Sequence, residues 1–302
     1  MPTDTCLGGI IPPMVTPFDE EGNLDEQAHH AEVQYLVESA RVHGLAVGGS
    51  TGEGHTLTLD ETRSLVAWTV EEARGRVPVI AGIITDSTRS AIERGRAVAD
   101  LGVAALQVTP VHYLFRPDDD AMLRHFAAIA EGARLPVIVY NVVPWSYLEP
   151  PLVARLLREV DGVIGVKQSA RDFQALAALL QFTNCGEAGR GKRILSAVDA
   201  LLYPSFVLGA HGAIAAILTA APEWCVALWQ AVQDGDHRRA LALHHELLRL
   251  WNALEAPNLP ANVKTALGLQ GRAAGHPRAP MPPTSPARAE RIRDALTQST
   301  HS

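Results

Sequence analysis

Residues 137–167 read VIVYNVVPWSYLEPPLVARLLREVDGVIGVK, and this stretch decides the fold. Two apolar runs, 137–141 and 163–167, have the length of buried strands. Between them, residues 150–160 follow the pattern of an amphipathic helix. A strand, a helix and a second strand in this order predict a βα unit within a parallel sheet.

The same alternation continues outward to both ends of the chain, and the number of strands decides the architecture. Eight runs of strand length predict an α/β fold, a (β/α)8 TIM barrel. The alternative is an open doubly wound sheet in two domains, but no break in composition supports a boundary. The predicted strands are 10–15, 45–48, 77–84, 104–108, 137–141, 163–167, 194–197 and 213–217. The predicted helices are 25–41, 59–73, 88–101, 118–133, 150–160, 172–182 and 199–208.

Residues after the eighth run are predicted to be helical and to lie outside the barrel. Helical patterns cover 222–233, 236–254, 260–269 and 286–296, whereas residues 271–288 hold too much glycine and proline for regular structure. We therefore expect a barrel over residues 1–220 and a C-terminal helical extension over residues 221–302, packed on the barrel.

The composition is that of a globular protein and excludes several classes. Of 302 residues, 47% are hydrophobic and 20% are charged, which excludes disorder as the main state. The net charge is −7 and no basic block occurs, so we expect no nucleic-acid partner. Since no targeting pattern or membrane-length apolar run occurs, we expect no membrane partner and a cytoplasmic location. Cys6, Cys185 and Cys225 lack metal or redox spacing and are predicted to be reduced thiols.

Lys167, which closes the sixth run, is the first candidate for chemistry, because barrel active sites lie at the carboxyl ends of the strands. The chain has only two other lysines, Lys192 in a polar turn and Lys264 in a helical pattern, and we expect both to face solvent. A buried ammonium is costly unless it is paired, whereas an amine in apolar surroundings has a lowered pKa and can attack a carbonyl. Lys167 is therefore the predicted nucleophile.

Two other runs also end in unusual residues. The second run continues into GGSTGE at 48–53, where glycines and hydroxyls let backbone N–H groups turn toward an anion such as a carboxylate. A plain tight turn explains the same residues. The fifth run ends in Tyr140 and Asn141, and Tyr140 is either a core residue with a satisfied hydroxyl or part of a site. The residues alone leave both alternatives open.

Metal and serine chemistry find little support in the sequence. The histidines at 29–30, 237 and 244–245 fall in amphipathic helices without metal-ligand spacing, so we expect them on solvated faces. Acidic residues 118–120 suit a helix cap. No Gly-x-Ser-x-Gly nucleophile elbow occurs. We therefore expect no metal site and covalent catalysis by an amine.

These motifs together resemble the family of dihydrodipicolinate synthase and N-acetylneuraminate lyase. The resemblance covers nearly the whole chain, and the ordered set of segments carries it. The segments are IPPMVTPF at 11–18, GGSTGE at 48–53, PVIAG at 78–82, TP at 109–110, YN at 140–141, GVKQS at 165–169, GAI at 212–214 and residues 260–269.

The resemblance implies a barrel enzyme, usually a homotetramer, that acts on 2-oxo acids such as pyruvate, with an aldehyde as the second substrate. It also implies catalysis without metal or organic cofactor. By position, Lys167 corresponds to the Schiff-base lysine and Tyr140 to the phenol that transfers protons, with Thr51 in the proton relay. The positions that bind the 2-oxo acid fall at Gly49, Ser50, Thr51 and Ile214.

Two segments depart from the family pattern. In dihydrodipicolinate synthases the segment after the tyrosine holds an arginine for the aldehyde's carboxylate, but residues 141–148, NVVPWSYL, contain none. The family's two adjacent tyrosines in the fourth loop, one of which reaches a neighbouring subunit's site, are replaced by VHYLF at 111–115. Either His112 or Tyr113 is the substitute.

The acceptor pocket is therefore expected to differ from that of the synthases. Trp145 and Tyr147 follow the catalytic tyrosine and predict an apolar or aromatic aldehyde. Two arginines, Arg89 and Arg116, are the remaining candidates to bind a carboxylate of the aldehyde.

The leading hypothesis is a class I lyase of 2-oxo acids, either an aldolase or a dehydratase. The first alternative is 4-hydroxy-tetrahydrodipicolinate synthase, which the missing arginine disfavours. The second is a non-catalytic 2-oxo acid binding protein on the same scaffold. Carboxylate binding alone would not need both Lys167 and Tyr140, so the residues favour an enzyme.

Overall fold

The computed structural model describes residues 7–169, 172–184 and 189–297, and its centre is a sheet of eight parallel strands. Their order is β1-β8-β7-β6-β5-β4-β3-β2. A parallel bridge between Pro13 and Ala46 closes the sheet, since it joins the segment after β1 to β2. The predicted (β/α)8 TIM barrel is therefore confirmed. The strands are β1 (Gly9–Ile10), β2 (Leu45–Val47), β3 (Val79–Ile83), β4 (Ala105–Val108), β5 (Val137–Asn141), β6 (Val163–Gln168), β7 (Arg193–Ser196) and β8 (Gly212–Ala213).

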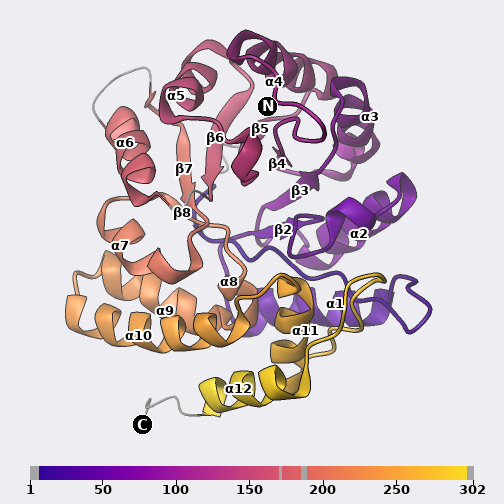
Figure 1. Cartoon of the computed structure of the whole chain (residues 1–302), viewed down its shortest axis with the longest axis vertical. Coiled ribbons are helices and arrows are strands. Elements are labelled where there is room, and N and C mark those ends of the chain that lie inside the picture. Colours follow the sequence, from indigo (N-terminus) through magenta and orange to yellow (C-terminus); the bar gives the residue numbers. More distant parts are fainter. Residues whose placement is uncertain (1–6, 170–171, 185–188, 298–302) are drawn as a thin grey trace.

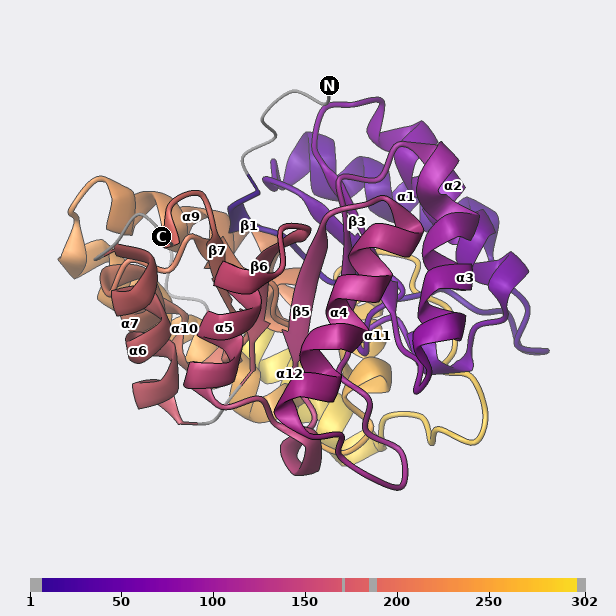
Figure 2. The same cartoon turned by 90° about the horizontal axis from the view of Figure 1, so that it is seen from above.

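Helices alternate with the strands and lie outside them (Figures 1 and 2). Side-chain caps begin several of them: Asp118, for example, accepts a hydrogen bond from Ala121 N at the start of α4, as the acidic run predicted. The helices of the barrel are α1 (Glu26–Gln34), α2 (Leu59–Ala73), α3 (Thr88–Val98), α4 (Asp119–Ala133), α5 (Pro150–Glu159), α6 (Phe173–Asn184), α7 (Leu202–Val207) and α8 (Ile217–Ala220). The shorter turns are η1 (Tyr35–Ser39), η2 (Gly54–Thr56), η3 (Ala99–Leu101), η4 (Pro144–Ser146) and η6 (Asp199–Leu201).

Two apolar cores hold the barrel together, because successive residues of a strand point to opposite faces. In β5, Val137 and Val139 point outward to the helices, whereas Ile138 points to the barrel axis. The same alternation turns Tyr140 inward. The axial core consists of Leu7, Ile11, Ala46, Ile80, Ala105, Ile138, Leu195 and Ile214.

Four further helices follow the barrel and pack along one side of it, orange to yellow in Figure 1. They are α9 (Pro222–Gln233), α10 (His237–Leu254), α11 (Leu259–Leu269) and α12 (Pro286–Thr297). Buried leucines at helical spacing, Leu243, Leu247, Leu250 and Leu254, form the inner face of α10. We call residues 221–297 the C-terminal extension; its standing as a separate domain stays a prediction.

Three predicted elements differ from those observed. The first run is a strand only at Gly9–Ile10, because Pro12 and Pro13 have no N–H to donate to a neighbouring strand. The helix predicted over 25–41 ends at Gln34 and continues as a π-helical turn. The eighth run leaves the sheet after Ala213, and residues 214–216 lead into α8.

Two residues expected to face solvent are buried, and these expectations were wrong. Lys264 is only 4% exposed because its ammonium is paired with Glu53. His29 is fully buried, and its Nε2 lies 2.7 Å from Thr69 Oγ1. Burial lowers the pKa of His29 to about 3. A polar residue on an amphipathic helix can thus face inward when a partner on another element satisfies it.

Two further observations concern the cysteines and the helices. Cys225 is a buried free thiol, whereas Cys6 and Cys185 lie outside the described residues. Within the described ranges, no helix combines the length and the apolar character that crossing a membrane requires.

Candidate active site

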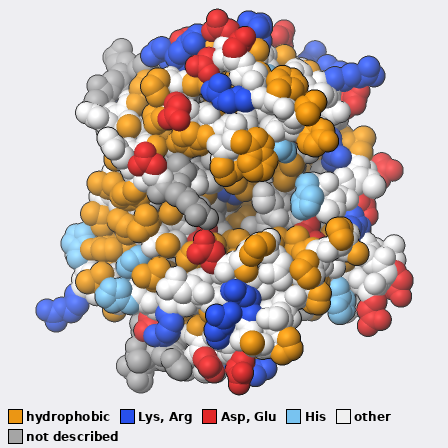
Figure 3. Space-filling model, viewed as in Figure 1, with side chains coloured by type: hydrophobic (Ala, Val, Ile, Leu, Met, Phe, Trp, Pro, Cys, Tyr) orange, Lys and Arg blue, Asp and Glu red, His pale blue; other side chains and the backbone are white. Residues whose placement is uncertain are grey.

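A cavity of about 730 Å³ lies at the carboxyl ends of the strands, where barrel enzymes carry their active sites. The face drawn in Figure 3 is hollowed near its centre. Residues of β5 and β6, and of the segments that follow β2, β5, β6, β7 and β8, meet in this cavity, and the C-terminal extension contributes the rest of the lining. The lining residues used below are Ser50, Thr51, His55, Tyr140, Lys167, Asp199, Ile214, Trp251, Glu255, Pro257 and Met281.

Lys167 and Tyr140 lie side by side on neighbouring strands. They are paired in the register of β5 and β6, and the Lys167 ammonium lies 3.8 Å from the centroid of the Tyr140 ring. Lys167 is 3% exposed and Tyr140 is 4% exposed. The sequence left open whether Tyr140 belongs to the core or to a site. Its ring is buried as in a core, and it also lines the cavity beside the amine.

Ser50 joins this pair from the turn after β2. Tyr140 Oη donates a hydrogen bond to Ser50 Oγ at 3.1 Å. Thr51 and Ile214 line the same cavity, whereas Gly49 of the same turn lies next to the side chain of Gln107 and is not a lining residue. The amine, the phenol and the hydroxyl-bearing turn, predicted from three separate strands, therefore meet at one place.

The turn after β2 is tightly wound, which explains its glycines. Gly48 has φ 72°, and a Cβ on Gly54 would lie 1.8 Å from the carbonyl oxygen of Gly48. Gly54 N donates to Gly49 O at 3.0 Å, and Thr16 Oγ1 donates to Gly52 O at 2.7 Å. Side chains larger than hydrogen would open this loop.

Asp199 is a site residue that the sequence did not single out. It follows β7 and lines the cavity, and its Oδ1 accepts a hydrogen bond from Ile217 N at 2.8 Å. Burial raises the pKa of its carboxyl to about 6, against hydrogen bonds from the backbone and the charge of Lys167. The available signal is an acid just past the end of a strand, and the same residue also suits the start of the helix predicted over 199–208.

A polar network fixes the segment that follows Tyr140. The Asn141 amide donates to Gln168 Oε1 and to Leu148 O, and Asn141 Oδ1 accepts from Leu148 N. Gln168 Nε2 in turn donates to Tyr147 Oη at 2.6 Å. These bonds close residues 141–148 into a loop outside the barrel, so Tyr147 is held by β6.

Within the described residues, no group of three or more His, Cys, Asp or Glu side chains has the arrangement of a metal site.

Comparison with known proteins identifies the family. The pattern of the dihydrodipicolinate synthetase family matches residues 6–299. The chain belongs to this family. It is similar to 4-hydroxy-tetrahydrodipicolinate synthase of Methanopyrus kandleri, with 36% identity over 91% of this chain and 90% of the relative. It is also similar to the synthase of that name in Phenylobacterium zucineum, with 37% identity over 94% of both chains.

Solved structures of the family share the fold over almost the full length. YagE, a prophage protein of the family from E. coli K12 in complex with pyruvate, has a TM-score of 0.90 and 29% identity, covering 97% of this chain and 98% of its own. The chain is accordingly an enzyme of the dihydrodipicolinate synthetase family, a lyase that works through a lysine Schiff base. The predicted family and enzyme class are confirmed.

The fourth loop, in which this chain departs from the family, lies away from the cavity of its own chain. Asp86 Oδ1 accepts hydrogen bonds from His112 N and Tyr113 N, and Trp145 Nε1 donates to His112 O. Tyr113 is 74% exposed and Trp145 is 71% exposed. Neither side chain lines the cavity, nor do His112 and Tyr147.

The two arginines considered for the acceptor carboxylate also lie elsewhere. Arg89 pairs with Glu93 and Arg116 with Asp119, and neither lines the cavity.

The C-terminal extension supplies lining residues that the sequence did not reveal. Trp251 and Glu255 come from the end of α10, Pro257 from the following turn, and Met281 from the segment before α12. Such residues lie more than 80 positions from Lys167 in the sequence. No local pattern marks them, because only the packing of the extension brings them to the barrel mouth.

Proposed function

We propose that this enzyme forms a Schiff base between pyruvate and Lys167 and makes or breaks a carbon–carbon bond to an aldehyde. The observation that carries the proposal is the contact of the Lys167 ammonium with Tyr140, whose hydroxyl is bonded to Ser50. No organic cofactor or metal is needed, because the imine itself supplies the electron sink.

The reaction divides into steps that the described groups can perform. The neutral amine of Lys167 adds to the carbonyl carbon of the 2-oxo acid, and the carbinolamine loses water to give an iminium. Loss of a proton from the methyl carbon of bound pyruvate then gives an enamine, which adds to an aldehyde carbonyl. In the cleavage direction, the electron pair of the broken bond moves into the iminium and the aldehyde leaves.

Tyr140 is the proposed acid and base for these proton transfers. Its ring contacts the amine and its hydroxyl is bonded to Ser50, so a proton can pass along the hydroxyl pair within the cavity. Thr51, which lines the same cavity, is the proposed further member of this relay, and the turn at 49–51 is the proposed binding site of the pyruvate carboxylate. Ile214 forms the apolar wall beside it.

We further propose that the acceptor is a neutral aldehyde. Among the described residues that line the cavity, Lys167 is the one Lys or Arg side chain, whereas two carboxylates, Asp199 and Glu255, face the same space. A second carboxylate on the acceptor would lack a lysine or arginine partner there, and His55 is the one further basic side chain among the described lining residues. An unpaired buried carboxylate costs several kcal/mol. The apolar surface of Trp251, Pro257 and Met281 suits an apolar portion of the aldehyde. The acceptor role expected for Trp145 and Tyr147 stays a prediction.

The names of the curated relatives favour a second candidate, 4-hydroxy-tetrahydrodipicolinate synthase. That reaction would require aspartate semialdehyde as acceptor, and hence a cationic partner for its carboxylate. Consumption of aspartate semialdehyde with pyruvate, compared with neutral aldehydes under the same conditions, separates the two candidates.

A homotetramer in the cytoplasm is also proposed, on the family resemblance and on the described surface. Tyr113, Leu114, Phe115 and Trp145 are large apolar side chains exposed on adjoining loops, as at an interface between subunits. In such an assembly His112 or Tyr113 reaches the neighbouring subunit's site.

The experiment that tests the function is trapping of the imine. Borohydride reduction in the presence of pyruvate, followed by peptide mass mapping, is expected to place the adduct on Lys167. An adduct on Lys192 or Lys264, or no adduct, would refute the mechanism.

A further inference from the structure

Glu53, the last residue of the GGSTGE segment, is fully buried and carries its carboxylate toward the C-terminal extension. Its Oε1 lies 2.7 Å from the ammonium of Lys264 on α11, and its Oε2 accepts a hydrogen bond from Arg278 N at 2.9 Å. Lys264 also donates to His276 O at 2.6 Å. One carboxylate of the turn therefore joins two segments of the extension.

The backbone of Glu53 is tied directly to the substrate turn. Its N–H donates to Ser50 O at 3.1 Å, and Ser50 is the residue that accepts the hydrogen bond from Tyr140. Glu53 has φ 55°, in the left-handed region that residues other than glycine rarely adopt. Such a conformation persists only when surrounding contacts hold it. Its side-chain bonds to the extension are among the contacts that do so, together with the hydrogen bonds that Thr56 N and Oγ1 donate to Glu53 O.

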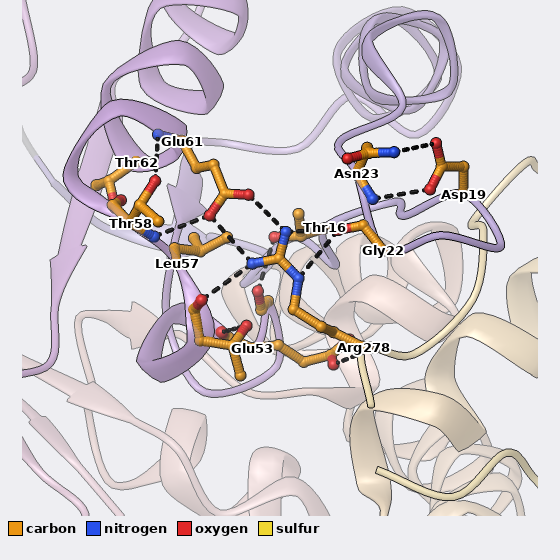
Figure 4. Close-up of polar contacts among 12 residues, drawn as sticks. Thr16, Asp19, Gly22, Asn23, Glu53, Leu57, Thr58, Glu61, Thr62 and Arg278 are labelled. Carbon is orange, nitrogen blue, oxygen red and sulfur yellow. Dashed lines mark hydrogen bonds and ion pairs between the residues drawn. The ribbon is translucent and has the colours of Figure 1, made fainter. Parts of the chain in front are cut away.

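Arg278 extends the same attachment to helix α2 (Figure 4). Its guanidinium pairs with Glu61 and donates to the carbonyl oxygens of Gly22 and Thr56. Lys264 and Arg278 also lie over the ring of Phe18, at 4.6 and 4.1 Å from its centroid. Two carboxylates and two cations thus form a charge-balanced cluster, which we call the Glu53 cluster (Glu53, Glu61, Lys264 and Arg278).

We propose that Glu53 and Lys264, with the backbone of Arg278, are positioning residues of the active site, through which the C-terminal extension holds Ser50 and Thr51 against Lys167. This inference rests on the proposed function, since it assigns the turn at 49–51 to the 2-oxo acid. Removing one partner of a buried ion pair leaves an uncompensated charge. Water can reach that charge only if the turn moves. Binding of pyruvate should then weaken.

A second buried ion pair offers a matched control. Arg272 of the extension pairs with Glu32 of α1; both are buried, and Arg272 also donates to Thr219 O. This pair likewise joins the extension to the barrel. None of these bonds involves the turn at 48–53. Breaking either buried pair should therefore lower the stability of the protein. Only a change in the Glu53 cluster should also displace the turn at 48–53.

The test compares Lys264→Met and Glu53→Gln with Arg272→Met. For each variant, thermal unfolding gives the stability, and steady-state kinetics at temperatures where all are folded give KM for pyruvate and kcat. We expect Lys264→Met to raise KM for pyruvate roughly tenfold or more, because a small misplacement of a positioning group has large effects. Glu53→Gln keeps neutral hydrogen bonds and should raise KM less. Arg272→Met should lower the melting temperature without raising KM.

The inference would be overturned if Glu53→Gln and Lys264→Met both had the same KM for pyruvate as the wild type. It would also be overturned by a rise of the same size in Arg272→Met. If Lys264→Met does not fold, Glu53→Gln alone decides: a raised KM for pyruvate supports the inference, and an unchanged KM overturns it. Absence of a borohydride-trapped pyruvate adduct in the wild type would instead overturn the proposed function itself.

Discussion

Tyr140 has two roles, one in the packing of the barrel and one in the candidate active site. Its ring fills the space between β5 and the barrel axis, where the buried aromatic surface stabilises the fold. Its hydroxyl is the only polar part, and it meets Ser50 in the cavity. The ring and the hydroxyl can therefore be separated by mutation.

Changing Tyr140 to Phe should leave the fold intact and slow turnover by roughly 10² to 10⁴, the usual worth of a positioned acid or base. Circular dichroism and unfolding curves measure the fold, and initial rates at saturating pyruvate measure turnover. A variant that unfolds at ordinary temperature while its folded fraction keeps full activity would assign Tyr140 to the core alone.

Asp199 predicts a dependence of stability on pH. Its pKa is about 6 in the folded protein against an ordinary value of 3.8, because burial disfavours the charged form. The folded state thus binds this proton more tightly than the unfolded chain. The resulting stabilisation is fully present below the unfolded pKa and is lost as the pH rises through about 6.

From about pH 4.5 to about pH 7.5, the wild type should lose about 1–3 kcal/mol more of its free energy of unfolding than Asp199→Asn does. The amide cannot ionise and still offers an acceptor for Ile217 N. Urea unfolding of both proteins at several pH values provides the measurement. Parallel curves for the two proteins would contradict the raised pKa.

At the scale of elements, the turn after β2 shows how backbone packing limits the sequence. Gly82 of β3 and Gly54 both lie against the carbonyl group of Gly48, where a Cβ would come within 2.5 and 1.8 Å of the oxygen. The neighbour is backbone, so it cannot move aside as a flexible side chain would. The turn and β3 are consequently packed backbone to backbone.

Gly54→Ala should therefore destabilise the protein by about 1–3 kcal/mol and raise KM for pyruvate, because the turn must shift to admit the methyl group. Gly268→Ala in α11 is the matched control: no heavy atom lies within 4 Å of its added Cβ. Gly268 is the next-to-last residue of α11, so the change should be neutral or stabilise by less than the roughly 0.5–1 kcal/mol of a helix interior. Similar free energies of unfolding for the two variants would mean that the turn can admit the methyl group without loss of stability.

At the scale of the whole molecule, the exposed apolar loops bear on assembly. Leu114 is 90% exposed and has φ 72°, and Phe115 beside it is 61% exposed. Apolar side chains presented in this way are typical of surfaces that another subunit covers.

Light scattering of the wild type should give about four times the chain mass of 32.4 kDa. Changing Leu114 and Phe115 together to Asp should yield smaller species, because a charge would be buried without a partner. Leu241→Asp serves as control, since Leu241 is an exposed leucine on α10. A wild-type mass of one chain would refute the tetramer.

Local patterns in the sequence determined the order of strands and helices and the place of the main catalytic candidates. Strand-length apolar runs and helical periodicity are properties of neighbouring residues, so they can be recognised before the chain folds. Lys167 and Tyr140 could be found because each lies at the end of such a run, and barrel geometry brings the ends of runs together.

Only the tertiary structure decided which residues complete the site and which charges are buried. The sequence around Lys264 predicts an exposed side chain, but Glu53, 211 positions away, pairs with it in the interior. Asp199 and Trp251 line the cavity because the barrel closes and the extension packs over its mouth. Burial and pairing depend on contacts between distant segments, and no spacing within one segment encodes them.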